Sequence, residues 1–414
     1  MSNKRIEPSP GDRTAHLPGL VINGKFLRHS TSRSGVYRVA REMLVALDRA
    51  LAANPALANA MTCRLVVPGG QAPGLQLSHV RLESGDRAGA PGRALSRWQA
   101  VLWEQLVLPR RAGGDTLISL CNIGPVAYRN AFTMVHDAQV YSNPSSYSRA
   151  FRSWYRLVLP RLGRRNRALL TVSDYSRMQL AHYGVARAED IRVVHNGCDH
   201  VLRLVPDASK VAAAGLAGQR YVLALANTQP HKNVAVLLKA FQCAALRDVT
   251  LALFGPATRE DFERQGHAVP DNVRFLGFVS DEQLAGLLLE AGVLAFPSTT
   301  EGFGLPPLEA MLLGCPVIAA PCGALPEVCG DAALWADAHQ PDAWSRQIVR
   351  LLHDAELRAD VQRRARAHAA QFTWDRAALG LIETVLGFAL ADPDSMPAPH
   401  RRRADAPGIP STTW

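Results

Sequence analysis

The chain has 414 residues, of which 48% are hydrophobic and 20% are charged. This composition excludes a disordered or fibrous protein, and the length suits two globular domains. A formal net charge of +10 favours anionic partners such as phosphorylated metabolites or acidic lipid. Because no zinc-finger spacing and no aromatic RNA-binding motif accompany that charge, nucleic acid is not an expected partner.

Both ends of the chain are polar. Residues 1–18 are expected to form a flexible arm, with no apolar segment of the kind found in a signal peptide. Residues 392–414 are rich in Pro, Arg and Asp and are expected to be disordered. No apolar stretch is long enough to span a bilayer, so we expect a cytoplasmic chain.

Residues 19–205 alternate short apolar runs with helical patterns, which indicates a parallel sheet covered by helices on both faces. Apolar residues at helical spacing predict a first helix from Val36 to Leu51, and further helices are predicted around 94–108, 146–164 and 174–183. The predicted strands are 20–23, 64–68, 116–120, 132–135, 168–172 and 191–194.

The alternation restarts after 206–219, a stretch that we interpret as a linker. A second Rossmann-like domain is therefore expected over 206–372, followed by a helix over 373–391 that packs back on the first domain. Two such sheets facing each other create a cleft at the carboxyl ends of their strands. The strands predicted here are 221–226, 249–254, 273–277, 293–297 and 316–320, and the helices are near 233–245, 281–291, 307–314, 341–353 and 355–371.

Seven cysteines are scattered along the chain, and an odd number in a chain that we expect not to be secreted indicates reduced thiols. Cys315, Cys322 and Cys329 are evenly spaced, but no CxxC pair is present. Buried structural thiols are therefore the favoured interpretation, with metal ligands as the alternative.

The strongest chemical signal lies between Phe296 and Pro321. A strand ends, a glycine-punctuated loop follows, and two prolines open a helix, a position where proline loses no intrahelical hydrogen bond. The amides of Phe303, Gly304 and Leu305 then lie at the positive end of a helix, which suits a diphosphate.

Two carboxylates flank these amides, and vicinal hydroxyls of a sugar can donate hydrogen bonds to them. Glu301 precedes the loop, and Glu309 is expected in the first turn of the helix. The alternative is that Glu301 is a surface residue and that Glu309 is simply a favourable first-turn charge.

The segment EGFGLPPLEAMLLGCPVIA resembles the Glu-x7-Glu signature of the family 4 retaining glycosyltransferases of the GT-B fold. The resemblance extends from about residue 20 to 388 and implies an α/β fold with two doubly wound Rossmann-like domains facing across a cleft. The first would bind the acceptor and the second the nucleotide-sugar donor. Other segments resembling that family are 134–148, 173–184, 191–199, 221–241, 323–335 and 372–385.

The resemblance also implies roles for residues that match the family's motifs. Glu309 falls where the donor ribose is held, Glu301 where the transferred sugar is held, and the amides of Phe303, Gly304 and Leu305 where sugar and diphosphate are held. The family's usual Arg-Lys pair in the phosphate loop is replaced by His231 and Lys232. A neutral histidine donates a hydrogen bond but carries no charge, so Lys232 is left as the cation of this loop.

Two residues of the first domain complete the expected site. Gly35 falls in the family's glycine-containing loop and would face the diphosphate from the other side; a plain strand-to-helix turn is the alternative. His136 follows a predicted strand and matches the family's active-site histidine, which would contact the transferred sugar; a structural histidine is the alternative. We expect His136, Lys232 and Glu301 to be the catalytic residues.

The expected chemistry breaks a C1–O bond to a diphosphate, and negative charge develops on the leaving phosphate. Lys232, the three amides and the helix dipole can stabilise that charge, so we expect neither a metal nor another cofactor. The one Asp-x-Asp, Asp392 to Asp394, falls in the predicted tail. Retention is implied by the resemblance, and a route in which the leaving phosphate deprotonates the acceptor on the same face is favoured over double displacement.

The expected donor is GDP-mannose and the expected acceptor a saccharide linked to polyprenyl diphosphate, as in bacterial polysaccharide biosynthesis. An epimerase or phosphorylase on the same architecture is one alternative. A non-catalytic protein that binds nucleotides or polyanions is another. A dehydrogenase is disfavoured because no GxGxxG follows an early strand.

A basic segment predicts a contact with an anionic membrane surface. Seven arginines and no carboxylate lie between Ser148 and Leu169. An apolar stripe at helical spacing beside these arginines predicts an interfacial helix, and a core-facing helix is the alternative. The stripe consists of Phe151, Trp154, Tyr155, Val158 and Leu162.

Overall fold

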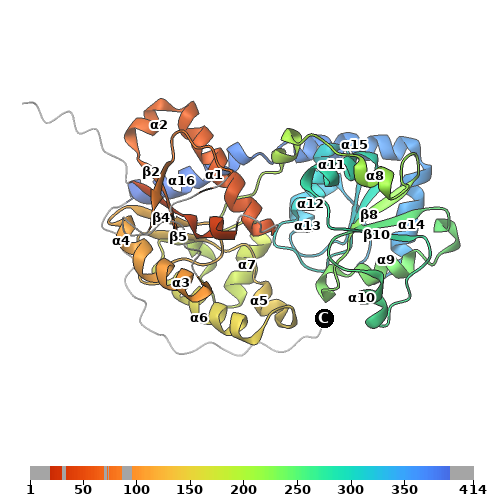
Figure 1. The fold of residues 1–414 in the computed structure, drawn as a ribbon, viewed down its shortest axis with the longest axis horizontal. Coiled ribbons are helices and arrows are strands. Elements are labelled where there is room, and N and C mark those ends of the chain that lie inside the picture. Colours follow the sequence, from red (N-terminus) through yellow and green to blue (C-terminus); the bar gives the residue numbers. More distant parts are fainter. Residues whose placement is uncertain (1–18, 30–33, 70–71, 73, 86–95, 392–414) are drawn as a thin grey trace, which may run out of the picture.

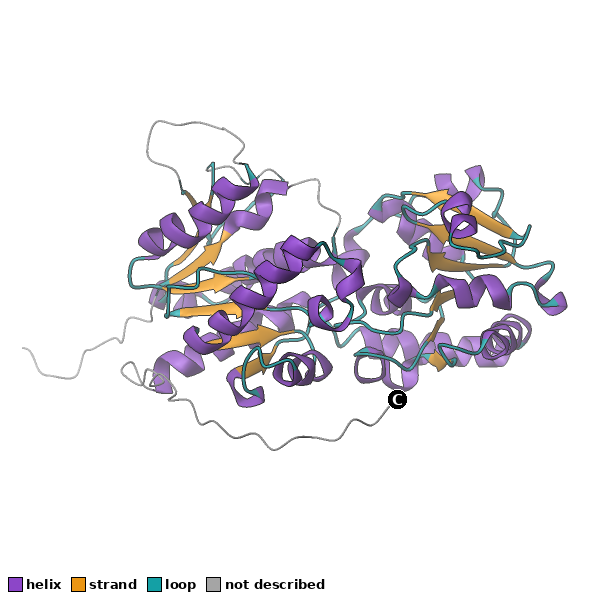
Figure 2. Cartoon of the chain, turned by 90° about the horizontal axis from the view of Figure 1, so that it is seen from below, coloured by secondary structure: helices purple, strands orange, loops and turns teal. Residues whose placement is uncertain are grey.

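The computed structural model describes residues 19–29, 34–69, 72, 74–85 and 96–391, and the arm and tail predicted at the two ends lie outside them. The described chain forms two α/β domains side by side, each with helices on both faces of a central sheet (Figures 1 and 2).

The first domain is built on a parallel sheet of seven strands in the order β3-β2-β1-β4-β5-β6-β7. The order reverses between β1 and β4, as in a doubly wound fold. Strands of a doubly wound sheet are buried on both faces, and every residue of the central strands β1, β4, β5 and β6 is buried. The strands are β1 (Leu20–Asn23), β2 (Cys63–Val67), β3 (Arg81–Ser84), β4 (Thr116–Ser119), β5 (Ala131–Met134), β6 (Ala168–Thr171) and β7 (Ile191–Val193).

The second domain has a parallel sheet of six strands in the order β10-β9-β8-β11-β12-β13, with the same kind of reversal between β8 and β11. The strands are β8 (Tyr221–Leu225), β9 (Thr250–Phe254), β10 (Val273–Gly277), β11 (Val293–Phe296), β12 (Val317–Ala319) and β13 (Leu334–Trp335). The predicted fold class, α/β with two doubly wound domains, is therefore confirmed.

Helices cover both sheets. Those of the first domain are α1 (Gly35–Ala53), α2 (Pro55–Ala60), α3 (Arg97–Leu102), a π-helical turn (Trp103–Val107), α4 (Leu108–Ala112), α5 (Gln139–Ser142), α6 (Arg149–Arg165) and α7 (Asp174–His182). Those of the second are α8 (Ser209–Ala213), α9 (Val234–Ala240), α10 (Arg259–Arg264), α11 (Asp281–Glu290), α12 (Leu305–Leu313), α13 (Leu325–Cys329), α14 (Pro341–His353) and α15 (Ala355–Ala369).

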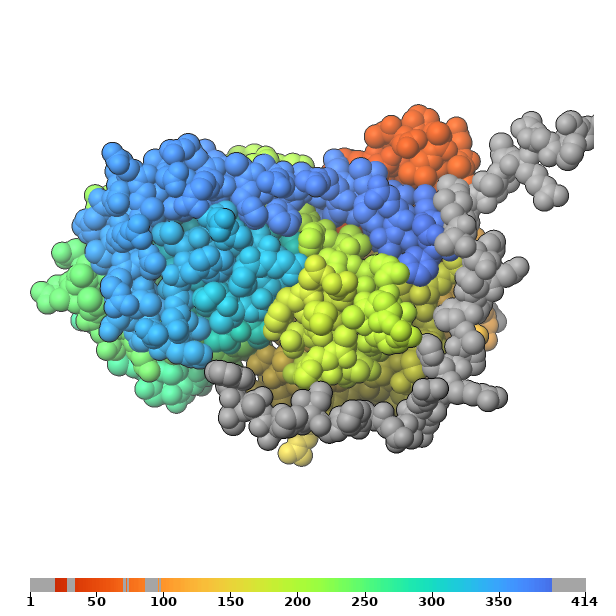
Figure 3. Space-filling view, turned by 180° about the vertical axis from the view of Figure 1, so that it is seen from behind, coloured from red at the N-terminus to blue at the C-terminus, as the bar shows by residue number. Residues whose placement is uncertain are grey.

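The last helix, α16 (Trp374–Ala391), leaves the second domain and packs on α1 of the first. Figure 3 shows this C-terminal segment, in blue, running along one edge of the molecule over both domains. Asp375 pairs with Arg49 of α1 at 2.6 Å, and the ring of Phe388 meets Phe132 of β5 edge-on. The chain thus crosses between the domains twice, once before α8 and once before α16.

The two crossings lie against each other. The amide of Cys198 donates to the carbonyl of Phe372 at 2.8 Å, and the amide of Trp374 donates to the carboxylate of Asp199 at 2.7 Å. A Cβ on Gly197 would lie 2.2 Å from the backbone nitrogen of Trp374, so this close approach depends on glycine.

Candidate active site

The loop between β11 and α12 is shaped by glycine. Gly304 has φ +98° and precedes the first helical residue, Leu305. A Cβ on Gly304 would lie 2.6 Å from Leu325, so no larger residue fits there without a shift. The helix begins at Leu305 rather than at the prolines. Glu309 is therefore its fifth residue, in the second turn and not in the first as predicted.

Lys232 and Glu301 meet at the carboxyl edge of the second sheet. Lys232 ends a short turn after β8, and its Nζ donates to Oε1 of Glu301 at 2.7 Å. The charges of Lys232 and Glu301 also act on the carboxyl group of Asp137 in the first domain. Burial raises the pKa of Asp137, the charge of Glu301 adds to that rise, and the charge of Lys232 opposes it. The two domains therefore place one ammonium and two carboxyl groups together.

His231 is buried, and its ring Nδ1 has no hydrogen-bond partner among the described residues. Its backbone carbonyl accepts from the amide of Thr299 at 2.8 Å, which anchors the turn to the loop after β11. Burial lowers the pKa of His231, and the neighbouring Lys232 lowers it further, so the ring is neutral near pH 7. The hydrogen-bonding capacity of this buried ring nitrogen is thus left unsatisfied by the described residues.

Glu309 is buried at the centre of a network that joins both domains. Its Oε1 lies 3.2 Å from an Arg38 guanidinium nitrogen and 3.1 Å from Nε2 of His200. The indole Nε1 of Trp374 donates to Nδ1 of His200 at 3.1 Å. Because an indole N–H only donates, Nδ1 must accept, and the proton of the His200 ring is on Nε2, facing Glu309.

These contacts keep Glu309 ionised although it is buried. Burial by itself raises the pKa of Glu309, but hydrogen bonds from His200 and the charge of Arg38 bring it below its ordinary value. Arg38 also pairs with Asp281 at the start of α11. A carboxylate charged at neutral pH with one oxygen engaged can accept from hydroxyl groups through the other.

His136 follows β5 and is buried. Its Nε2 lies 2.8 Å from the carbonyl of Leu120, and its amide donates to Asn122 at 2.9 Å. A carbonyl only accepts, so Nε2 carries the ring proton and Nδ1 is left as an acceptor. Burial lowers the pKa of His136 to about 4, opposed by the hydrogen bond to Leu120. The imidazole is therefore neutral at physiological pH.

The two domains are in contact at Gly302 of the second domain, which lies against Ser173 and His136 of the first. Its carbonyl accepts from the Ser173 hydroxyl at 2.6 Å, and a Cβ at this position would lie 2.5 Å from the carbonyl oxygen of His136. Gly302 belongs to the Glu301–Glu309 loop and His136 to the other domain. The predicted catalytic histidine is thus brought against the predicted donor loop.

A second domain contact involves Glu327 of α13. Its carboxylate accepts from the amides of Asp174 and Tyr175, at 2.8 and 2.9 Å, and so caps α7 of the first domain. Nε2 of His195 lies 3.3 Å from the same carboxylate.

Seven of the predicted site residues lie on the second domain around the loop before α12, and His136 meets this loop from the first domain. The seven are His231, Lys232, Glu301, Phe303, Gly304, Leu305 and Glu309. Gly35 is exposed at the start of α1, and a Cβ there would meet nothing within 4 Å. The contact that reaches the donor loop from α1 comes instead from Arg38, one turn further on.

Sequence reasoning missed Arg38, His200 and Trp374. Arg38 lies three residues after Gly35, and His200 directly follows the segment 191–199, so both lie beside motifs that the family resemblance identified. Their partners are far away in sequence: Arg38 and Glu309 are 271 residues apart. Local patterns cannot reveal such a pairing.

The apolar stripe predicted on α6 faces mostly inward. Val158 and Leu162 are buried, and Trp154 and Tyr155 pack against the same cluster. The core-facing alternative therefore holds for these four residues, whereas Phe151 is 40% exposed. Pro160 lies inside the helix without ending it.

In the described part of the chain, no group of three or more His, Cys, Asp or Glu side chains is placed to hold a metal ion. No helix there is both long enough and apolar enough to cross a bilayer.

Comparison with known proteins identifies the family to which this chain belongs. A family model described as "Glycosyl transferases group 1" matches residues 210–368. The chain is 31% identical over 331 residues to O-antigen chain mannosyltransferase B of Escherichia coli, covering 72% of this chain and 84% of that protein. It is 35% identical to a D-inositol 3-phosphate glycosyltransferase of Salinispora arenicola, over 49% of this chain and 50% of that protein.

Among solved structures, a sucrose-phosphate synthase from Thermosynechococcus elongatus superposes with a TM-score of 0.66 at 19% identity, covering 91% of this chain and 100% of that one. The likeness to the synthase shows the fold alone. The E. coli protein, in contrast, is similar to this chain in sequence over most of its own length. The chain belongs to the group 1 glycosyl transferases, as a family 4-like glycosyltransferase of the GT-B fold.

Proposed function

We propose that this glycosyltransferase transfers a hexose with retention of configuration, from a nucleoside-diphosphate donor to a saccharide acceptor in bacterial polysaccharide biosynthesis. Mannose from GDP-mannose is the favoured donor, because a relative that is similar over 84% of its own length is an O-antigen chain mannosyltransferase. An acceptor carried on polyprenyl diphosphate is the corresponding acceptor class.

One observation carries the proposal. Lys232, Glu301 and Glu309 surround the glycine loop before α12, and His136 of the other domain closes against that loop. In this arrangement Glu309 would hold the ribose, Lys232 and the amides of residues 303–305 the diphosphate, and Glu301 the sugar. The unpartnered Nδ1 of His231 fits the same interpretation, because a phosphate oxygen would supply its missing partner.

In the proposed reaction the bond between C1 of the sugar and the β-phosphate oxygen breaks, and the phosphate keeps the electron pair. The ammonium of Lys232 and the positive end of α12 stabilise the resulting charge. The acceptor hydroxyl attacks C1 on the face that the phosphate leaves, and its proton passes to the departing phosphate. Neutral His136, with Nδ1 as an acceptor, orients a hydroxyl of the transferred sugar.

The proposed reaction needs no metal, because Lys232 and the helix amides provide the positive charge that a divalent ion would supply. We expect full activity in the presence of EDTA. Loss of activity that added Mg²⁺ or Mn²⁺ restores would contradict this part of the proposal.

The test is a panel of nucleotide sugars in which release of the nucleoside diphosphate is measured with and without a lipid-linked saccharide. Turnover of GDP-mannose in preference to UDP-sugars is expected. Lys232→Ala should lower kcat/KM by about 100- to 1,000-fold, as loss of a partner for transition-state charge does. Binding without release of nucleoside diphosphate from any donor would favour the non-catalytic alternative, and a changed sugar on an intact donor would favour an epimerase.

A further inference from the structure

The first domain carries a second candidate site, a cavity of about 1010 Å³ near the amino-terminal ends of β5 and β6, at the opposite edge of the sheet from His136. Its walls come from the end of α6, the loop before β7, the loop before β5 and the π-helical turn after α3. Six arginines line it, together with a single carboxylate, Asp190; the arginines are Arg129, Arg161, Arg164, Arg165, Arg167 and Arg187.

The walls of this cavity are held by specific contacts. The side chain of Gln105 donates to the carbonyl of Gly124 at 3.0 Å and accepts from the amide of Val126 at 2.9 Å, which fixes the π-helical turn to the loop before β5. On the other side, a Cβ on Gly163 would lie 2.0 Å from the carbonyl oxygen of Val185. The close packing of α6 on the loop before β7 therefore requires glycine.

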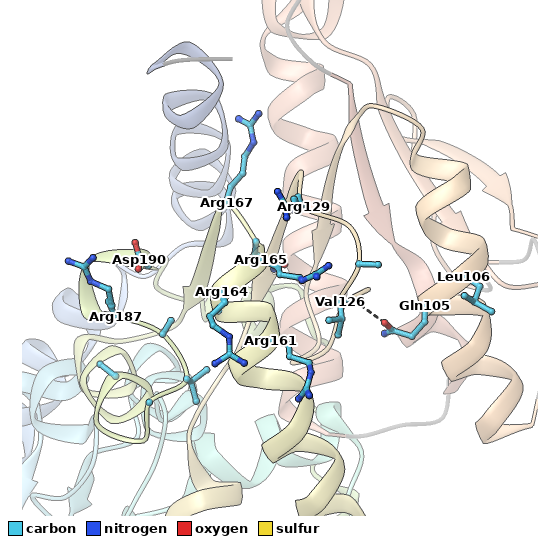
Figure 4. Close-up of a pocket in the computed structure, with 17 residues that line it drawn as sticks. Gln105, Leu106, Val126, Arg129, Arg161, Arg164, Arg165, Arg167, Arg187 and Asp190 are labelled. Atoms are coloured by element: carbon cyan, nitrogen blue, oxygen red, sulfur yellow. Dashed lines mark hydrogen bonds between the residues drawn. The ribbon is translucent and has the colours of Figure 1, made fainter. Parts of the chain in front are cut away.

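Most of the positive charge in the cavity is not neutralised by the protein. Arg187 pairs with Glu189, whereas none of the other five arginines has a carboxylate partner among the described residues. Figure 4 shows Arg165 extended toward Val126 and Gln105, and Arg161 and Arg164 directed to one side of α6. Clustered unpaired guanidinium groups attract anions, and the planar fork of arginine matches a phosphate.

An exposed apolar stripe leads to the rim of this cavity. Leu106 lines the cavity and is 52% exposed, and Leu102 and Trp98 precede it by one and two helical turns with exposures of 56% and 76%. The opposite face of the same helical segment is buried, with Trp103 and Leu108 in the core. Leu157 of α6 is also exposed, one turn before Arg161. Large apolar side chains exposed in a row beside unpaired cations are typical of a surface that meets a bilayer.

We propose that this surface, formed by Trp98, Leu102, Leu106 and the cavity arginines, docks on an anionic bilayer. The apolar stripe enters the interface, and the cavity receives the phosphate of a lipid headgroup. Charge complementarity selects the occupant, because the cavity combines excess cations with an apolar rim, and an anionic phospholipid presents phosphate and hydrocarbon side by side. This inference does not depend on which donor or acceptor the active site uses.

The docking surface also corrects where the membrane contact lies. The sequence analysis placed the apolar part of it on α6, but four of the five residues of that stripe pack toward the core and Phe151 alone among them is exposed. The structure supplies the apolar part from α3 and the π-helical turn, and the basic part from the end of α6 and the loops beside it.

The test is co-sedimentation of the full chain with vesicles of phosphatidylcholine alone or mixed with phosphatidylglycerol, at low and high salt. We expect binding only to the mixed vesicles, weakened by salt. Each arginine near an anionic surface strengthens binding about fivefold, so Arg164→Ser with Arg165→Ser should weaken it roughly 30-fold. A matched pair on the second domain, Arg346→Ser with Arg350→Ser, removes the same charge from α14 and should change it far less.

The apolar stripe is tested separately. Leu102→Ser with Leu106→Ser should weaken vesicle binding, whereas Leu289→Ser, which removes an exposed leucine from α11, should not. Tryptophan emission should shift to the blue on addition of mixed vesicles, and Trp98→Phe should remove most of that shift. Because these side chains are exposed, melting temperature and donor turnover without vesicles should stay unchanged.

Three outcomes would overturn the proposal: equal binding to neutral and anionic vesicles, equal effects of the surface pair and the control pair, or no binding at low salt. A soluble ligand is separated by calorimetry with inorganic diphosphate alone. Binding of diphosphate that depends on Arg164 and Arg165, without vesicle binding, would assign the cavity to a soluble phosphate compound and reject the bilayer.

Discussion

At the scale of single residues, the carboxylate of Glu309, which we propose binds the donor, is positioned by contacts within the protein. Arg38 and His200 both contact its Oε1, and no described residue forms a hydrogen bond or ion pair with Oε2. In the proposed function, Oε2 is the oxygen that would accept from the ribose hydroxyls. Since Trp374 fixes the tautomer of His200, the indole acts on the donor site through two hydrogen bonds.

Replacing Glu309 by Gln should therefore weaken the donor more than it slows chemistry. A hydrogen bond to a charged group contributes about 1.5–3 kcal/mol, so KM for the donor should rise about 10- to 100-fold. Calorimetric titration with the free nucleoside diphosphate measures the same loss directly. Glu301→Gln is the matched control, because it should lower turnover and leave affinity for the free nucleotide unchanged. Unaltered nucleotide affinity in folded Glu309→Gln would remove the ribose assignment.

The buried imidazole of His136 should make stability depend on pH. Its folded-state pKa of about 4 is below the unfolded value of 6.5, so the unfolded chain binds more protons between these values. Stability should rise as pH increases from about 4 to 6.5, and this group contributes about 3 kcal/mol of that rise. His136→Gln should flatten the urea-unfolding profile in that window. A profile as steep as that of the unaltered chain would show that other groups cause the dependence.

Sequence reasoning found one side of this site and not the other. Lys232, Glu301 and Glu309 lie beside strand ends or helix starts that local patterns reveal, so they could be named from spacing and resemblance. Arg38 and His200 reach Glu309 only after two domains have come together. No local signal marks an arginine whose partner lies 271 residues away.

At the scale of elements, the buried strands were predictable because short, mostly apolar runs between helical patterns have few other interpretations. Two edge strands were not. Three of the four residues of β3 are exposed, two of the four are charged, and β13 has only two residues. The segment 206–219, interpreted as a linker, contains the short helix α8, whose Val211 is buried in the core. Alanine-rich linkers and short helices look alike in sequence.

The loop before α12 packs against the β5–α5 loop of the first domain, and Gly302 lies at the point of contact. Gly302→Ala should preserve nucleotide binding, because the donor side of the loop is unaltered, but should hold the two loops apart. Displacement of catalytic groups by about 1 Å can cost about 100-fold in rate, so kcat should fall by that order. Gly387→Ala on α16, where a Cβ would meet nothing within 4 Å, is the control. A normal kcat in Gly302→Ala would mean that this contact does not form during catalysis.

At the scale of the whole molecule, Glu327 holds the second domain to the helix amides of the first. Burial raises the pKa of Glu327, but hydrogen bonds from His195 and the two amides bring it below its ordinary value. The stabilising effect is therefore present above the unfolded pKa near 4.5 and lost as pH falls below it.

Glu327→Ala should shift the chain toward a more open arrangement, by about tenfold in the closure equilibrium, since charge-assisted hydrogen bonds are lost. Small-angle scattering should report a larger radius of gyration, and the acceptor KM should rise. Glu263→Ala, which removes an exposed carboxylate from α10, is the control. Identical scattering curves for the two variants would show that Glu327 does not set the domain arrangement.

The paired crossings at Cys198–Phe372 have a mechanical consequence. Two chain segments bonded side by side form a pivot, and displacement in a rotation grows with distance from its axis. His200 and Trp374 lie next to this pivot, and through them Glu309 is close to it. Opening the molecule therefore moves these groups least. If Glu309 holds the ribose as proposed, we expect the ribose pocket to keep its shape in an open form, so that the nucleotide binds first and closure then assembles the groups for sugar transfer.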